Sequence, residues 1–193
     1  PSAAHPLILD GGENTLRTDV PSGYTLHVRG GGEGHGYLRS ARSFRNAGTL
    51  LLESRNAGWI SAIEMPGPDG FGVENVGRIV VGAGSLGPRW IRGDLTNRGV
   101  VQVEPGVTLD LQRTGGAVLE QADGAIEVDA VGALVLDTGS FRFTGGRLQG
   151  PRRPFTHAAN SGSRLRRGPH HRRRVGGGSR GDRVGQPRLD RTA

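Results

Sequence analysis

Short runs in this chain alternate apolar residues with other residues, and a glycine precedes most of these runs. The run after Gly99 shows the pattern clearly, because Val101 and Val103 are apolar while Gln102 between them is polar. A period of two places successive side chains on opposite faces of a β-strand. These runs therefore predict short strands that each have one apolar face.

The same turn and strand recur in five copies when the chain is aligned on the turn glycine. The copies are NAGTLLL at Asn46, NAGWISA at Asn56, NVGRIVV at Asn75, NRGVVQV at Asn97 and ADGAIEV at Ala122. The fourth and sixth residues after the first are apolar in every copy. Glycine and asparagine both tolerate left-handed backbone, so we expect a tight left-handed turn before each strand.

The spacing of these copies predicts how the strands associate. The turn glycines are separated by 10, 19, 22 and 25 residues, and periods near twenty residues are typical of solenoids. A strand with one apolar face cannot bury that face alone, but stacked coils bury a continuous apolar column. We predict an all-β fold, a single-stranded parallel β-helix (β-solenoid). An antiparallel β-sandwich, which also uses short strands and glycine-rich turns, is the alternative.

The composition changes abruptly at Pro151. Residues 151–193 hold twelve arginines and two aspartates, a net charge of +10, so residues 1–150 carry −3 of the chain's total of +7. This segment has one aromatic residue, Phe155, and few aliphatic residues, too few to offset the entropy lost on ordering. We therefore predict a β-solenoid repeat domain at residues 1–150 and a disordered arginine-rich tail at residues 151–193.

Three interpretations of the tail remain open. Its clustered arginines could neutralise phosphates and bind nucleic acid or another polyanion without sequence preference. They are Arg164, Arg166, Arg167, Arg172, Arg173 and Arg174. The tail could instead have no partner. It could also be a non-native reading frame, because arginine, glycine, proline, alanine and histidine dominate when a GC-rich gene is translated out of frame, and the chain contains no lysine.

Composition also excludes several kinds of site. The chain has no cysteine and no apolar run near eighteen residues, which excludes a disulfide framework, thiolate metal sites and a membrane-spanning segment. His5, His27 and His35 show no spacing typical of metal ligands. We expect neither a metal nor a cofactor.

Residues 82–87 fit the G-x-G-x-x-G pattern and follow a predicted strand, as in dinucleotide-binding proteins. That fingerprint must open a helix whose N-terminus holds the pyrophosphate. The residues from Pro88 onwards are not a helical pattern. We interpret the glycines as a turn of the solenoid.

Candidate catalytic and glycan-binding residues are few. Cleavage of a polysaccharide needs two acids, or acids with a basic partner, in one cleft, but the carboxylates of the later coils are spread singly along the chain. They are Glu104, Asp110, Glu127, Asp129 and Asp137. We expect a solvated face and no enzyme. Three aromatic side chains could stack on a sugar ring if exposed, with packing in the core or in turns as the alternative. They are Trp59, Trp90 and Tyr37.

The segments FRNAGTLLLES, LTNRGVVQVEPGVTLDL and FRFTGGRLQG resemble coils of the β-solenoid repeats of large bacterial surface and secreted proteins. That group includes autotransporter passengers and filamentous-haemagglutinin-like adhesins, and the resemblance covers residues 7–150. It implies a structural or adhesive module of an exported bacterial protein, located outside the cell or at its surface. The implied partner is a glycan or a host or neighbouring surface, and exposed coil ends could also self-associate.

Solenoids of this kind also serve as enzyme scaffolds. A carbohydrate-active β-helix, acting as a polysaccharide lyase or hydrolase or binding a glycan, is therefore the second hypothesis. Polyanion or nucleic-acid binding through the tail is the third.

Overall fold

The structure, a computed structural model, describes residues 6–67, 70–85, 87–150 and 155–157. These residues form an all-β parallel solenoid of about six coils. Within these ranges every regular element is a strand. Accordingly, none of the described elements is a helix that could span a membrane.

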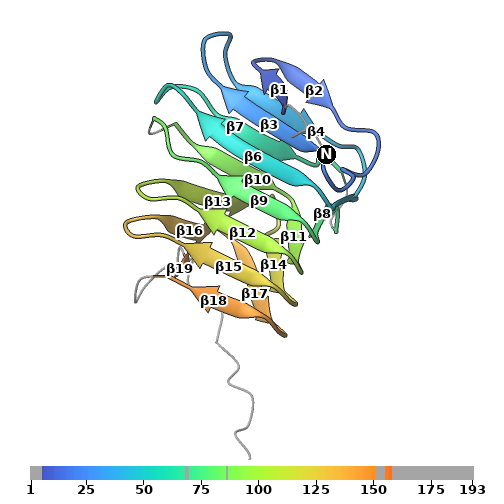
Figure 1. Cartoon of the computed structure of the whole chain (residues 1–193). Coiled ribbons are helices and arrows are strands. Elements are labelled where there is room, and N and C mark those ends of the chain that lie inside the picture. Colours follow the sequence, from blue (N-terminus) through green and yellow to red (C-terminus); the bar gives the residue numbers. More distant parts are fainter. Residues whose placement is uncertain (1–5, 68–69, 86, 151–154, 158–193) are drawn as a thin grey trace, which may run out of the picture. The chain divides into compact units, whose positions relative to one another are not determined.

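The strands form three parallel sheets, A, B and C, and each complete coil contributes one strand to each sheet in turn (Figure 1). Sheet A contains β1 (Leu7–Asp10), β3 (Thr25–Gly30), β6 (Thr49–Ser54), β9 (Arg78–Val81), β12 (Val100–Val103), β15 (Ala125–Val128) and β18 (Arg147–Gln149). Sheet B contains β2 (Glu13–Thr15), β4 (Gly36–Arg39), β7 (Ser61–Glu64), β10 (Arg89–Arg92), β13 (Thr108–Gln112), β16 (Ala133–Leu136) and β19 (Phe155–His157). Sheet C contains β5 (Phe44–Asn46), β8 (Gly72–Asn75), β11 (Asp94–Asn97), β14 (Ala117–Gln121) and β17 (Gly139–Phe143).

Neighbouring strands come from successive coils, and the named strands that pair are parallel in all three sheets. This confirms the predicted β-solenoid and excludes the antiparallel sandwich. The structure also places β19 beyond Gly150, the predicted end of the repeat domain, where β19 pairs with β16. The tail arginines named above lie outside the described residues.

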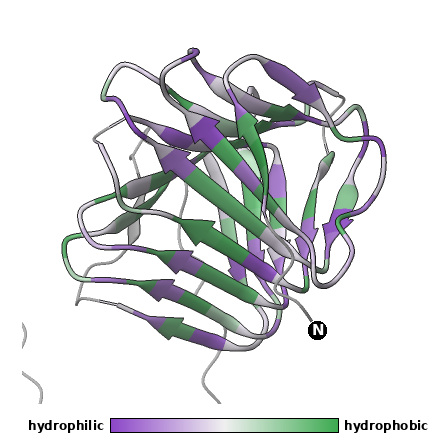
Figure 2. Cartoon of the chain, turned by 45° about the horizontal axis from the view of Figure 1, so that its top comes forward, coloured by the Kyte–Doolittle hydropathy of each residue, from purple (hydrophilic) through white to green (hydrophobic). Residues whose placement is uncertain are grey.

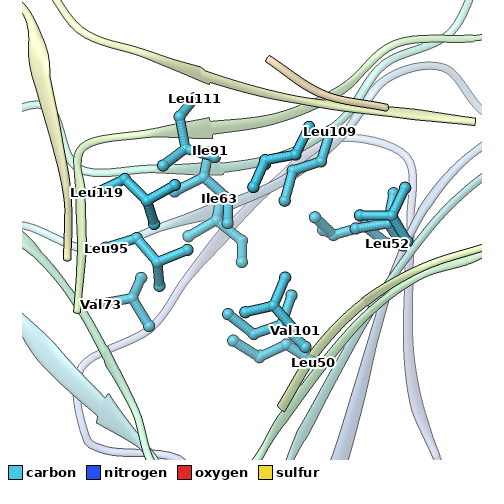
Figure 3. Packing of buried hydrophobic residues seen from close by; sticks show 14 of the residues in the cluster. Leu50, Leu52, Ile63, Val73, Ile91, Leu95, Val101, Leu109, Leu111 and Leu119 are labelled. Carbon is cyan, nitrogen blue, oxygen red and sulfur yellow. The ribbon is translucent and has the colours of Figure 1, made fainter. Parts of the chain in front are cut away.

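The core is a set of apolar columns inside the coils. Leu50, Ile79, Val101 and Ile126 align in register along sheet A and are fully buried. Figure 3 shows side chains from all three sheets converging on the same interior, and Figure 2 shows green and purple residues alternating along many strands. Burying each such aliphatic side chain contributes about 1.5–3 kcal/mol. The predicted inward and outward faces of sheet A are confirmed.

A ladder of buried side-chain amides lines the corner where sheet C turns into sheet A. Asn46 donates to the Asn75 Oδ1 atom over 2.8 Å, Asn75 donates to Asn97 over 2.7 Å, and Asn97 donates to the Gln121 Oε1 atom over 2.8 Å. Asn46, Asn75 and Asn97 also each donate to a backbone carbonyl of the next coil, those of Arg78, Val100 and Ala125. The repeated asparagine is therefore a buried bridge between coils, in strand conformation.

The turn glycines have a different role from the predicted one. Gly48, Gly77 and Gly99 do not have positive φ, so the expected left-handed turn is wrong for these three copies, whereas Gly124 has φ +65°. These positions require glycine because the backbones of successive coils lie in contact at this corner and leave no room for a Cβ atom. A Cβ atom at Gly77 would lie 2.2 Å from the carbonyl oxygen of Gly48, and one at Gly99 would lie 2.1 Å from that of Gly77.

Two of the five aligned copies are placed differently by the structure. Asn56 and Gly58 are exposed in a loop, and the strand after them, β7, belongs to sheet B. The copy at Asn56 was therefore wrong, because a local match of turn and strand does not say which corner the turn occupies. In the last copy Gln121, and not Ala122, takes the amide position, since its longer side chain reaches Asn97 across a corner with one extra residue.

Replacing Val103 with Asp should destabilise the protein by more than about 4 kcal/mol, because an unpaired carboxylate would enter the apolar interior. The neighbouring change Gln102→Asp should cost about 0.5 kcal/mol or less, since this partly exposed side chain points outward. Chemical denaturation of both variants measures the difference. Equal stabilities would contradict the assignment of inward and outward faces.

Gly77→Ala should cost about 2 kcal/mol or more, because its new methyl group overlaps the backbone of the preceding coil. Gly58→Ala is the matched control. Its Cβ atom would meet only the Asn56 side chain, 3.7 Å away, so its midpoint of thermal unfolding should stay near that of the unmodified protein. Similar losses in the two variants would mean that corner contact is not what requires glycine.

Candidate functional site

The outer face of sheet B carries the most varied chemistry among the described surfaces. Its strands align outward-pointing side chains in two adjacent rows. The first row is Tyr37, Ala62, Trp90, Asp110 and Val135. The second row is Arg39, Glu64, Arg92 and Gln112, continued by Asp137 directly after β16. Neighbouring members of a row lie on strands about 4.8 Å apart.

Glu64 is the centre of a charge network in the second row. Its side chain is only 8% exposed, and it accepts hydrogen bonds from Arg39 Nε over 2.9 Å and Arg92 Nη1 over 2.6 Å. Arg39 also pairs with Glu13 on β2 over 2.5 Å. Two arginines therefore pair with two carboxylates, of which Glu64 is nearly buried and binds both arginines.

The same two arginines lie over the aromatic rings of the first row. The guanidinium carbon of Arg92 is 4.3 Å from the centre of the Trp90 ring, and that of Arg39 is 5.2 Å from the centre of the Tyr37 ring. Each contact covers one ring face by a cation–π interaction. Ala62, between the rings, is fully buried. The rings are thus partly committed to packing on the sheet surface.

Trp59 precedes β7 and reaches the same region through a histidine. The ring of His35 lies 5.0 Å from Trp59 in an edge-to-face contact and 5.7 Å from Tyr37. His35 Nδ1 also accepts the backbone N–H of Ile60 over 3.0 Å. The structure therefore brings two of the three predicted aromatic residues into one cluster, while Trp90 lies two strands from Tyr37.

Two of the candidate carboxylates lie near one another on this face, because Asp110 is opposite Val135 and Asp137 follows two residues later. Burial raises the pKa of Asp110 above its ordinary value, a hydrogen bond from Trp90 opposes that rise, and the charge of Asp137 adds to it. The prediction that the carboxylates are spread singly is wrong for this pair. These residues, 27 positions apart in sequence, become neighbours because Asp110 lies on β13 and Asp137 directly follows the adjacent strand β16.

An open groove of about 780 Å³ adjoins these residues at the edge of sheet B. Its lining includes Arg92, Gln112, Arg113 and Asp137, together with Pro66 from the segment after β7. Arg113 pairs with Asp94 over 2.8 Å. The groove therefore presents hydrogen-bond donors and acceptors beside the Trp90–Asp110 pair.

The other candidate carboxylates lie elsewhere. Glu104 accepts the backbone N–H of Ala83 over 2.6 Å. Glu127 and Asp129 line a smaller groove of about 270 Å³ beside β12 and β15. In the described ranges no group of three or more metal-ligating side chains could hold an ion.

The glycine-rich segment between β9 and β10, of which residues 82–85 and 87 are described, surrounds a buried arginine. Arg89 is 1% exposed and donates to the carbonyl oxygens of Ser85 over 2.7 Å and of Gly82 over 3.1 Å. Burial lowers the pKa of this guanidinium. This described segment joins β9 to β10, as expected of a turn of the solenoid.

One signal for this face was present in the sequence. Tyr37-Leu38-Arg39 and Trp90-Ile91-Arg92 share an aromatic, aliphatic, arginine order, and both occupy the same register of sheet B. This second repeat is not part of the turn-and-strand pattern that predicts the solenoid. Asp110 and Asp137 share no such sequence pattern, so the sequence could not predict that they lie near one another.

Comparisons with models of protein families, with curated proteins and with solved structures found no match to this chain.

Asp110→Asn should stabilise the protein at pH 7. Because the pKa of Asp110 is raised in the folded protein, the folded state binds the proton more tightly than the unfolded state does. The unmodified protein therefore loses stability as the pH rises from the ordinary pKa of aspartate to the raised pKa of Asp110. The amide side chain of the variant mimics the protonated carboxyl group, so the variant does not lose stability as the pH rises. The gain in melting temperature should be largest at neutral pH and should vanish below about pH 3.9, the ordinary pKa of aspartate. A gain independent of pH would contradict the assignment.

Proposed function

We propose that this chain is a structural or adhesive module of an exported bacterial surface protein, and that it binds an extended glycan along the outer face of sheet B. The observation that carries the proposal is the alignment of Trp90, Asp110, Arg92 and Gln112 beside the open groove. These residues come from β10 and β13, so two coils build one surface (Figure 1).

The composition of this face supports a sugar ligand. Sugar-binding surfaces combine an aromatic or apolar contact with a few placed polar groups that fix orientation. Trp90 provides the first, while Arg92 and Gln112 provide donors and Asp110 and Asp137 provide acceptors for hydroxyl groups. The Glu64 carboxylate holds Arg92 in place, which reduces the side-chain entropy lost on binding.

The regular spacing of the strands supports a polymer. Each coil adds another set of outward side chains about 4.8 Å further along the sheet, so a ligand with repeating units meets similar intervals. The resemblance to bacterial surface solenoids and the absence of cysteine support export to the cell surface. An antibody against the solenoid that stains intact cells of the source organism would test that location.

A carbohydrate-active β-helix is the second candidate, favoured by one observation. Asp110 has a raised pKa and a second carboxylate, Asp137, beside it. Glycoside cleavage uses two carboxyl groups of which one stays protonated. If this candidate is correct, Asp110 is the proton donor and Asp137 the carboxylate partner.

The test uses the full chain and a panel of immobilised and soluble polysaccharides. Glycan binding should weaken about tenfold in Trp90→Ala, since truncating a central aromatic contact typically costs more than 1 kcal/mol. Val80→Ala, on the outer face of sheet A in the neighbouring strand β9, should bind normally. Circular dichroism checks that both variants fold.

The same samples distinguish the two candidates. Reducing ends and the absorbance of unsaturated products are measured after incubation. Binding without turnover supports the adhesive module. Turnover that disappears in Asp110→Asn would replace it with the enzyme, and the absence of binding to any glycan would overturn glycan binding along sheet B.

A further inference from the structure

Core residues of sheet A are exposed at the two ends of the solenoid. Leu7 on β1 is 60% exposed and Leu148 on β18 is 38% exposed. Both belong to one inward column, whose central members Leu50, Ile79, Val101 and Ile126 are fully buried. Arrays of repeats normally end in coils with a polar outer face. Here each end instead presents an apolar residue of the kind that the next coil covers elsewhere in the column.

The backbone at these ends is suited to the same contact. β1 and β18 are the first and last strands in the order of sheet A (Figure 1). The edge of such a strand presents backbone donors and acceptors that can pair with another chain. All pairs in sheet A are parallel, so the edge of β18 suits a further parallel strand. β1 of a second copy of the chain is such a strand, because it already begins the same sheet.

The charges of the two ends are opposite. The N-terminal end, residues 6–20, holds three acids and one arginine, a net charge of −2, whereas the C-terminal end, residues 139–150, holds two arginines and no acid. The opposition recurs on the outer face of sheet C, where Asp19 and Arg142 have side chains that are more than half exposed. Unlike ends therefore attract one another, while like ends repel.

We propose that a second copy of this chain binds at each end of the solenoid, so that copies stack head to tail with β1 of one copy added to β18 of the next. In the register that continues sheet A, Leu7 packs on Leu148 and Ile8 lies beside Gln149. A shift by one residue would turn Leu7 outward. This inference does not depend on glycan binding.

The geometry of the contact determines how many copies join. The contact uses two different surfaces, so every added copy leaves one N-terminal end and one C-terminal end free. Such a heterologous contact that does not close gives an open filament. Each copy in that filament would lengthen the outer face of sheet B.

The first test measures self-association of the full chain by sedimentation velocity over a range of concentrations. We expect species larger than a dimer as the concentration rises. Leu7→Lys and Leu148→Lys should each weaken association at least about tenfold, because each places an ammonium group in the apolar column of the contact. Val131→Lys is the matched control, since Val131 is 84% exposed in the loop between β15 and β16, and it should associate normally. Circular dichroism checks that all variants fold.

Mixing the two end variants tests the head-to-tail arrangement. The Leu7→Lys variant keeps an intact β18 edge, and the Leu148→Lys variant keeps an intact β1 edge. An equimolar mixture should therefore form a dimer of one copy of each variant and nothing larger. A contact between two like ends would instead leave one of the variants able to associate alone, and that result would overturn the inference.

Engineered cysteines test the register, because the chain contains no cysteine of its own. Neighbouring strands place paired Cα atoms about 4.8 Å apart, within the range of about 4.4–6.8 Å that a disulfide spans. Mixing the Ile8→Cys and Gln149→Cys variants under mild oxidation should give a disulfide-linked dimer on a non-reducing gel. Val80→Cys, in the same outward row at the middle of sheet A, is the control and should not link to Ile8→Cys.

The remaining outcomes overturn the inference. A monomer at every concentration means that the ends do not bind a second copy, and association that persists in both lysine variants places the contact elsewhere. Failure of the cysteine pair to link excludes the stated register. None of these results bears on glycan binding, which has its own variants on sheet B.

Discussion

Buried amides at the corner between sheets C and A are bonded to one another from coil to coil. Asn75 accepts from Asn46 and donates to Asn97, and its amide also donates to the Val100 carbonyl. A buried polar group left without a partner costs about 1–3 kcal/mol. A coil that slipped by one residue would break several such bonds at once. The amide ladder therefore favours one stacking register, and the three sheets follow it.

That register explains the close packing of the corner. The hydrogen bonds between the amides hold successive turns close together. As a result, the carbonyl oxygen of the glycine in one coil lies where a Cβ atom of the glycine in the next coil would be. The same constraint aligns the apolar columns, since Leu50, Ile79 and Val101 follow the corner by a constant number of residues. The packing of the core and the hydrogen bonds at the corner thus depend on the same separation in sequence between the asparagine and the first inward residue of the following strand.

The outer face of sheet B is a consequence of the same alignment. Outward side chains do not contribute to the core, so they are free to differ between coils while their backbone positions remain equivalent. At two of these positions the rings of Tyr37 and Trp90 pack against the guanidinium groups of Arg39 and Arg92. Asp110 and Asp137 are brought near one another by the same alignment, because Asp110 lies opposite Val135 and Asp137 follows two residues later.

The sequence alone determined the architecture of sheet A and its core. Alternation with a period of two identified Val101 and Val103 as inward, and recurrence near twenty residues indicated stacked coils, because both depend on local backbone geometry and burial. The sequence also showed that the asparagines are repeated. However, the predicted reason, a left-handed turn, was wrong, because these asparagines are buried bridges between coils. A turn residue and a buried bridging residue look alike when only one coil is considered.

Only the tertiary structure decided where each turn lies and which residues meet. The Asn56 copy matches the repeat locally but leads into sheet B, because a corner is defined by the coil stacked on it. Likewise, Gln121 occupies the amide position since its side chain reaches Asn97. The position of Asp137 near Asp110 depends on the number of residues between β13 and β16, and no repeated motif in the sequence fixes that number. Contacts between coils are long-range, so they follow from register and not from local pattern.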